Sequence, residues 1–514
     1  MLRFSTIVLL LVALTTGLSG QGTLEDYKRA DNAGNLFGNK VYNGNVRPVW
    51  IGESSMFWYE NTTPSGRTYV MVDAVKGTKK EAIDQVKFAK SFESATGTKA
   101  EPGKLPIRNI TFAANAGSFT FEFEGLRYTC NLKNYSVIKG DSIRQPGGRG
   151  AAGGGSGWAW NTPDELRNPP VPSPDRKWTA FVKDFNVFIR SNEDRKEYQL
   201  SYDGGLGEYY SANIRWSPDS KKLMTAKVRP AEPHMIHYVE AAPADQFQPK
   251  HSSFEYRKPG DAIPQSYPQL FDVETKTHLQ VETGMIGNQY SVGQYRWAPD
   301  SKYFTFEYNK RGHQVYQVIK VDAATGKHSV LVNETSATFI DYSGKKYRND
   351  MPATNEMIWA SERDGWNHLY LYDTRTGNVK NQITKGEWVV RSVLNVDEAT
   401  RQITFQASGR EPGDPYLIHV YTINFDGTGL KKLTEGDGTH EVFFSPDRKF
   451  FVDTWSRMDA PPVTVLRNSS DGSQVIEIEK ADISELLKTG WKMTEVFQSK
   501  ARDGKTDIWG IIVR

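Results

Sequence analysis

Four short segments of this chain repeat one pattern, a Ser-Pro-Asp or Ala-Pro-Asp turn followed by a run of strand-forming residues. Proline fixes φ and aspartate hydrogen-bonds its own backbone, so each copy predicts a tight turn that enters a strand. A recurring unit of this kind restricts the chain to folds built from many copies of one small element. The four segments are 173–181, 216–226, 297–306 and 444–453.

A second repeated unit is a strand that ends in a polar hairpin turn and returns as another strand. Several of the turns carry Thr-Gly or Asp-Gly, the residues that tight hairpins require. Eight copies over the chain give a mean period of roughly 58 residues, somewhat above the 40–50 typical of propeller repeats. The eight copies are 69–82, 127–138, 186–200, 269–281, 316–331, 368–383, 419–433 and 462–478.

These counts predict an all-β fold, an eight-bladed β-propeller, because radial packing lets small sheets bury faces that none could bury alone. The best candidates for short helices are 79–96 and 480–490. The Pro-rich segment 229–268 interrupts the repeat and is expected to be an arm or lid rather than a blade. The Gly-rich run 144–160 lacks the Gly-Lys-Ser/Thr of a phosphate-binding loop.

The first 20 residues have the order of a signal peptide: Arg3, an apolar run over 7–14, and then small residues. The apolar run is short for a membrane span, and no span is expected in the mature chain. The single cysteine, Cys130, excludes a disulfide framework and is expected to be buried. These features predict an exported protein, periplasmic or secreted. The small net charge of +3 and the lack of a basic, aromatic stripe give no support to a nucleic-acid partner.

Motifs for catalysis and metal binding are missing from the sequence. There is no Gly-x-Ser-x-Gly nucleophile elbow, and 153–158 fails because Trp158 stands where the last glycine is needed. No His-Glu-x-x-His occurs, and His234 and His237, three residues apart, are weak evidence for a metal. We therefore expect no catalytic residues, no metal site and no cofactor within these 514 residues.

Taken together, the motifs give the chain a resemblance to a known family. From about residue 25 onward it resembles the N-terminal propeller of the dipeptidyl peptidase IV group, in the prolyl oligopeptidase clan of serine peptidases. The segments that carry the resemblance are YYSANIRWSPDSKKL (209–223), ASERDGWNHLYLYD (360–373), ITKGEWVV (383–390), ASGREPGDPYLIHVYTINFDG (407–427) and FQSKARDGKTDIWGIIVR (497–514).

The resemblance implies an exported serine exopeptidase that cleaves short peptides after a penultimate proline or alanine, with the propeller screening substrates by size. In the family, paired glutamates bind the α-amine of the substrate and an arginine lies near its carbonyl. Here only one acid, Glu208, stands near the place of the paired glutamates, so dipeptidyl specificity stays open. Arg311 stands where the arginine of the family faces the central cavity of the propeller. Glu362 and Arg363 are expected to hold a blade turn together.

The resemblance also implies a domain division: signal peptide 1–20, propeller 25–490, and 491–514 as the truncated first strand of an α/β-hydrolase domain. The strand expected over 506–513 has no partner after it in the sequence. The Ser, Asp and His of that domain are not expected within this chain, which is therefore expected to be inactive alone. Expected partners are a peptide substrate, the missing hydrolase domain and a second copy through 229–268. The alternative is a stand-alone exported propeller that binds a peptide, glycan or protein without catalysis.

Overall fold

The computed structural model describes residues 22–142 and 163–513. The expected signal peptide 1–20 and the Gly-rich run 144–160 lie outside the described residues. The chain divides into two units, which are described separately. Unit 1 comprises 1–145, 411–421 and 431–514, and unit 2 comprises 146–410 and 422–430.

Unit 1 contains three antiparallel four-stranded sheets, each with its strands in sequence order. The first is β1 (Val49–Trp50), β2 (Met56–Thr63), β3 (Gly66–Asp73) and β4 (Thr78–Glu81). The second is β5 (Arg108–Phe112), β6 (Ser118–Phe123), β7 (Leu126–Asn131) and β8 (Val137–Ser142). The third is β32 (Thr439–Phe444), β33 (Phe450–Arg457), β34 (Ala460–Asn468) and β35 (Gln474–Lys480).

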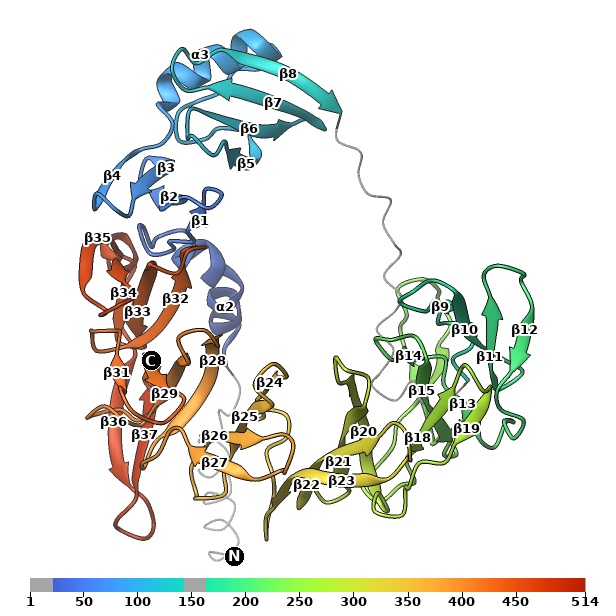
Figure 1. Ribbon diagram of the computed structural model, residues 1–514. Coiled ribbons are helices and arrows are strands. Elements are labelled where there is room, and N and C mark those ends of the chain that lie inside the picture. The colour runs from blue at the N-terminus through green and yellow to red at the C-terminus, as the bar shows by residue number, and fades with distance from the viewer. Residues whose placement is uncertain (1–21, 143–162, 514) are drawn as a thin grey trace, which may run out of the picture. The chain divides into compact units, whose positions relative to one another are not determined.

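Three helices and a hairpin also belong to unit 1. They are α2 (Leu24–Phe37), α3 (Gln85–Thr96), α4 (Ser484–Leu487), β36 (Glu495–Lys500) and β37 (Asp507–Ile512). Helix α3 lies along the second sheet (Figure 1), where Phe88 and Phe92 are fully buried against Phe119 and Phe121. The strand expected near the end of the chain is β37. Its partner precedes it, because the Asp503-Gly504 turn folds β37 back onto β36.

Unit 2 contains the sheets that carry the cavities described below. The first sheet is β9 (Val171–Pro172), β10 (Trp178–Lys183), β11 (Asn186–Ser191) and β12 (Glu197–Gln199), and the second is β13 (Tyr209–Tyr210), β14 (Arg215–Trp216), β15 (Lys222–Arg229), β18 (Gln265–Asp272) and β19 (Thr277–Leu279). The third sheet is β20 (Gln289–Trp297), β21 (Tyr303–Lys310), β22 (Val315–Asp322) and β23 (His328–Thr335). The fourth sheet is β24 (Arg348–Met351), β25 (Glu356–Ser361), β26 (His368–Asp373) and β27 (Val379–Gln382).

The remaining described strands form one more blade sheet and one hairpin. The sheet is β28 (Val389–Asp397), β29 (Gln402–Ser408), β30 (Ile418–Asn424) and β31 (Lys431–Lys432). The hairpin is β16 (Met235–Glu240) and β17 (Lys250–Glu255), a separate two-stranded sheet inserted between β15 and β18. This hairpin is the arm expected in 229–268. Across the described residues there are thus eight blade sheets, and the fold is an eight-bladed β-propeller.

The two sequence repeats have separate places in the blades. Each of the eight hairpin segments forms the third and fourth strands of one sheet, and each Ser-Pro-Asp or Ala-Pro-Asp turn joins a first strand to a second. The turns also link neighbouring sheets: the backbone N–H of Asp175 donates to Ser220 Oγ at 3.0 Å, and that of Asp219 donates to Ser301 Oγ at 3.1 Å. The repeated turn therefore sets both the strand reversal and the contact between consecutive blades.

Apolar clusters between neighbouring sheets form the core. In unit 2, Phe306 and Ile319 of the β20–β23 sheet pack with Leu270 of β18 in one cluster, and Val318 of β22 packs with Trp359 of β25 in another. In unit 1, the first sheet packs against β33–β35 through a cluster that includes Phe57 and Leu466. Sheet-to-sheet burial of this kind is what stabilises repeated small sheets. Cys130 is buried, as expected.

Candidate functional site

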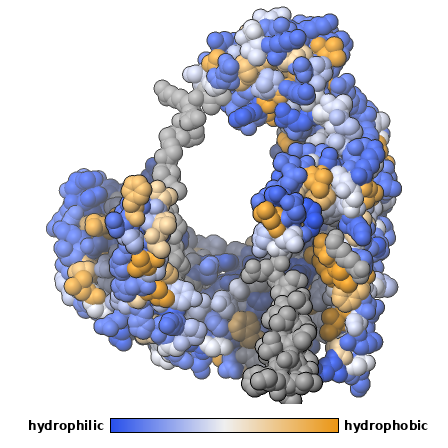
Figure 2. Space-filling model, turned by 180° about the vertical axis from the view of Figure 1, so that it is seen from behind, coloured by the Kyte–Doolittle hydropathy of each residue, from blue (hydrophilic) through white to orange (hydrophobic). Residues whose placement is uncertain are grey.

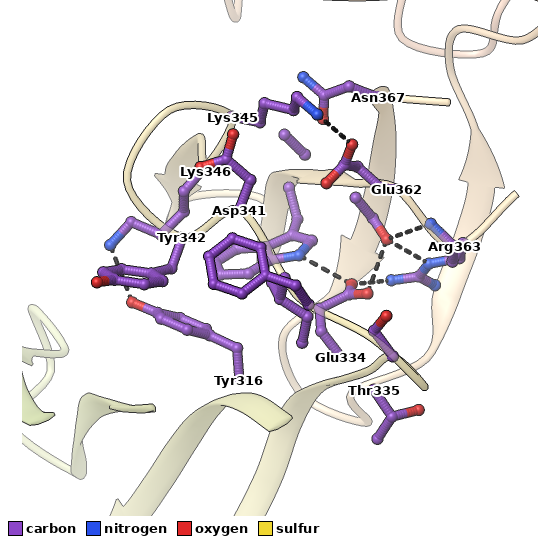
Figure 3. Close-up of a pocket in the computed structure, with 16 residues that line it drawn as sticks. Tyr316, Glu334, Thr335, Asp341, Tyr342, Lys345, Lys346, Glu362, Arg363 and Asn367 are labelled. Atoms are coloured by element: carbon purple, nitrogen blue, oxygen red, sulfur yellow. Dashed lines mark hydrogen bonds and ion pairs between the residues drawn. The ribbon is translucent and has the colours of Figure 1, made fainter. Parts of the chain in front are cut away.

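A cavity of about 220 Å³ lies in unit 2 where the end of β23, β25 and the segment 336–346 meet (Figure 3). Trp359 and Ser361 of β25 and the turn residue Arg363 form one side, and Phe339 and Tyr342 form the opposite side. The lining is therefore mixed, with aromatic rings beside charged groups. Sites for small ligands commonly combine the two in this way.

Glu334 is the central charged group of this cavity. It is buried on β23, and its carboxylate accepts hydrogen bonds from Trp359 Nε1 at 3.0 Å and Ser361 Oγ at 2.8 Å. The Arg363 guanidinium also donates to Glu334 and lies 4.4 Å from the centre of the Tyr370 ring. Figure 3 shows the side chains of Glu334 and Arg363 pointing toward one another. The carboxylate is thus fully engaged by the protein. Of the two residues expected to hold a blade turn together, Arg363 bonds to Ser361 beside the turn, whereas the Glu362 side chain pairs with Lys345.

A second charged group, Glu307, lies on β21 of the same sheet, with β22 between it and β23. Glu307 is buried and accepts hydrogen bonds from Lys346 Nζ at 2.6 Å and from the Tyr316 hydroxyl at 2.5 Å, with Arg348 at 3.3 Å. Burial alone would raise the pKa of Glu307, but the hydrogen bonds from Lys346 and Tyr316 outweigh it and lower that pKa. Glu307 is therefore ionised and matched by cations.

A larger cavity, about 750 Å³, lies beside the first and shares Tyr316, Tyr342 and Lys346 with it. Residues of β20 form much of its wall, including the amide side chains of Gln289 and Gln294. Other lining residues come from Ser211 to Arg215 and from Ile263 to Ser266. Amides, a hydroxyl and cations of this kind can hydrogen-bond the backbone of a bound peptide.

The segment 336–347 separates the two cavities and is held in place by the turn between β21 and β22. Ile340 N–H donates to the carbonyl of His313 at 2.8 Å, and the His313 ring stacks on Tyr342 with centroids 4.6 Å apart. Tyr290 and Phe339 complete this aromatic group. A hydrogen bond with Tyr290 and burial raise the pKa of Tyr342 to about 12. The Tyr342 hydroxyl is therefore neutral at physiological pH.

Neither of the two residues expected to bind substrate lines either cavity. Glu208, just before β13, pairs with Lys227 at 3.2 Å and with Arg229, and its hydrogen bond to Arg229 contributes most to lowering its pKa. Arg311 lies half-buried in the β21–β22 turn, where its backbone N–H donates to the Asn288 carbonyl at 2.8 Å. Glu362 lines the smaller cavity and pairs with Lys345 at 2.6 Å.

The sequence did not point to Glu334, Glu307 or Lys346. All three lie in strands or loops, where a charged residue is expected to be exposed to solvent. Glu334 and Glu307 are buried only because the next sheet packs over them.

Among the described residues, no group of three or more His, Cys, Asp or Glu could hold a metal ion. No helix within 22–142 and 163–513 is long and apolar enough to cross a membrane.

Comparison with known proteins identifies the family. The model of the dipeptidyl peptidase IV N-terminal region matches residues 156–462, well over half of the chain. The chain belongs to this family. Curated relatives include a dipeptidyl-aminopeptidase B of Aspergillus niger, 22% identical over 373 residues, and a probable dipeptidyl-aminopeptidase B of Talaromyces marneffei, 23% identical over 378 residues. Each alignment covers 65% of this chain and 41% of the relative.

A solved structure agrees with the propeller fold. Dipeptidyl peptidase 4 of Porphyromonas gingivalis superposes with a TM-score of 0.52 at 17% identity, over 95% of this chain and 66% of that one. At this identity the likeness concerns the fold. The resemblance to the dipeptidyl peptidase IV N-terminal region seen in the sequence is thus confirmed, while the chain spans less than half the length of the curated relatives it matches.

Proposed function

We propose that this chain is the substrate-gating propeller region of an exported serine exopeptidase of the dipeptidyl peptidase type, acting on short peptides that contain proline or alanine. The observation that carries the proposal is the family match over 156–462, together with relatives described as dipeptidyl-aminopeptidases. The Ser-Asp-His chemistry of such an enzyme belongs to an α/β-hydrolase domain. The 514 residues contain no Gly-x-Ser-x-Gly for it.

The cavity of about 750 Å³ supports a peptide as the ligand. Its volume lies within the range of small-molecule sites, about 300–1,000 Å³. Its lining offers the amide group of Gln294, and Arg296 sits near the end of β20. The amide of Gln289 is already held by the Ser266 backbone. The described residues around this cavity offer hydrogen-bonding groups and a defined shape. Their part in the enzyme is to bind the peptide substrate and to screen it by size.

We further propose that Glu208 binds the α-amine of the substrate and that Arg311 lies near its carbonyl. A carboxylate suits an ammonium group because charge-assisted hydrogen bonds fix its position. Glu208 is already paired with Lys227 and Arg229, so an incoming ammonium has to displace one of these cations. The exchange costs little, because Glu208 and Arg229 are both partly solvent-exposed and such pairs are weak.

Isothermal titration of the 514-residue chain with Ala-Pro-Ala and with its N-acetylated form tests the proposal. We expect the free-amine peptide to bind more tightly, and Glu208→Gln to weaken it by about tenfold while leaving the acetylated peptide unchanged, since one charge-assisted hydrogen bond is lost. Glu274→Gln, which removes a comparable exposed pair with Lys221, serves as the matched control. Equal affinity for both peptides would contradict the role of Glu208, and no binding of either would contradict the gating function.

Export and self-association complete the proposal. The order of residues 1–20 supports export to a periplasmic or secreted location.

The arm presents three aromatic side chains that are each about half exposed, and these support pairing with a second copy of the chain. They are Tyr238, Phe254 and Tyr256. Figure 2 shows hydrophobic residues as separate patches on a mostly hydrophilic face. N-terminal sequencing of the exported protein and light scattering of a chain lacking 235–255 test these two points.

A further inference from the structure

The arm carries two histidines that its strand pairing brings together. In the antiparallel register of β16 and β17, His237 stands opposite Ser253 and Val239 stands opposite His251. The two histidines are therefore diagonal neighbours on the same face, close enough for long side chains to meet. His234, three residues before His237, falls on the other face because strand residues alternate.

The two imidazoles face each other through nitrogen atoms. His237 Nδ1 lies 3.3 Å from His251 Nε2, and the rings are nearly parallel, with an interplanar angle of 16° and centroids 5.3 Å apart. Both side chains are exposed to solvent. Two ring nitrogens are thus held side by side at an accessible surface.

We propose that His237 and His251 form a binding site for a divalent transition-metal ion of the zinc type. Zn²⁺ binds histidine nitrogens at about 2.0–2.1 Å in tetrahedral geometry, which places two such nitrogens about 3.3–3.4 Å apart. The separation of 3.3 Å between His237 Nδ1 and His251 Nε2 agrees with this value. Either ring nitrogen of a neutral histidine can serve as a ligand.

The surroundings favour a cation at this pair. The other side chains on the same face of the two strands are Met235, Val239, Ser253 and Glu255, none of which carries a positive charge. Lys250 lies on the opposite face and pairs with Asp245 at 2.7 Å. The two rings form a hydrogen bond when one of the facing nitrogens carries a proton, and zinc binding requires both of them to be unprotonated. Two water molecules would complete a tetrahedral set, one more than at catalytic zinc sites, which have three protein ligands.

Binding at this pair would connect the two strands of the arm. A two-stranded ribbon is marginally stable on its own, and β16 and β17 pair only with each other among the described strands. An ion held by one histidine from each strand adds a link across the ribbon. The order of the arm then depends on the metal.

Titration of the full chain with ZnCl₂, followed by calorimetry, tests the site. We expect one zinc per chain at this site and a loss of affinity of at least about tenfold in His237→Ala and in His251→Ala, because either change turns a chelate into a single ligand. Both side chains are exposed, so the variants are expected to fold. His234→Ala, which removes an arm histidine that contacts Asp261 at 2.7 Å on the other face, is the matched control and should bind zinc as the parent does.

Hydrogen exchange supplies a second measurement that does not depend on affinity. Zinc should slow amide exchange in 235–240 and 250–255 in the parent chain and in His234→Ala, and should leave it unchanged in His237→Ala. Unchanged zinc affinity in both His237→Ala and His251→Ala would overturn the proposal, as would exchange in the arm that does not respond to zinc.

Discussion

At the scale of single residues, the candidate site is organised by buried acids whose charges the protein itself neutralises. Glu307 and Glu334 lie on β21 and β23 of one sheet, with β22 between them, and each collects several donors from the next sheet or from the segment 336–348. Buried carboxylates of this kind are costly unless every one is paired. Their hydrogen bonds and ion pairs hold together the strands and the segment that line the two cavities.

Glu334→Ala should destabilise unit 2 by about 2–4 kcal/mol, because it leaves Arg363, Trp359 Nε1 and Ser361 Oγ without their shared acceptor. The measurement is the urea unfolding midpoint of the full chain. Glu362→Ala removes the partly exposed pair with Lys345 in the same cavity and should cost below about 1 kcal/mol. Equal effects of the two changes would show that Glu334 is not the organising charge.

His419 predicts a pH dependence of stability in unit 1. It is buried against His440, and burial first and the His440 charge second lower its pKa from 6.5 to about 4. The unfolded chain takes up this proton near pH 6.5 and the folded chain only near pH 4. The contribution to stability is therefore present in full above pH 6.5 and is lost as the pH falls toward 4, by up to about 3 kcal/mol.

The prediction is checked by measuring unfolding midpoints between pH 7.5 and 4 in the parent and in His419→Gln. The variant should lose less stability over this interval than the parent does. His328→Gln, a change at a partly exposed histidine that pairs with Glu282, is the control and should keep the parent's pH profile. A parent profile that is flat between pH 6.5 and 4 would refute the role of His419.

At the scale of elements, α3 is part of the core of the second sheet rather than a surface addition. Phe88→Ala should destabilise unit 1 by about 3–5 kcal/mol, because it empties a fully buried position among Phe92, Phe119 and Phe121. Val86→Ala on the same helix removes an exposed side chain and should change stability by about 0.5 kcal/mol at most. The comparison uses thermal unfolding followed by circular dichroism.

The same elements show what the sequence could and could not reveal. All eight hairpins were predictable, because turn residues such as Asp322 and Gly326 in the β22–β23 turn determine their geometry locally. Helix α2 was not predicted, since none of its residues is buried and its apolar pattern is weak. Glu334 was missed for a different reason. Its burial depends on Trp359 and Arg363, which lie 25 and 29 residues further along the chain.

At the scale of the whole molecule, the proposed function assigns binding to the propeller and catalysis to a separate domain. The cavities are formed by side chains from neighbouring blade sheets and the segments beside them, and the described residues around them are paired acids, amides and aromatics. The nucleophile elbow typical of the clan does not occur in the printed sequence. This leads to a prediction for the chain taken alone.

The 514-residue chain should bind short Xaa-Pro peptides but not hydrolyse chromogenic Xaa-Pro or Xaa-Ala substrates. Peptide-bond hydrolysis by this clan requires a serine activated by histidine and an oxyanion hole, and binding energy alone does not supply them. Release of the chromophore is followed over hours at high protein concentration, with boiled protein as the blank. Turnover that a serine-directed phosphonate blocks would contradict the prediction and would place the nucleophile within these residues.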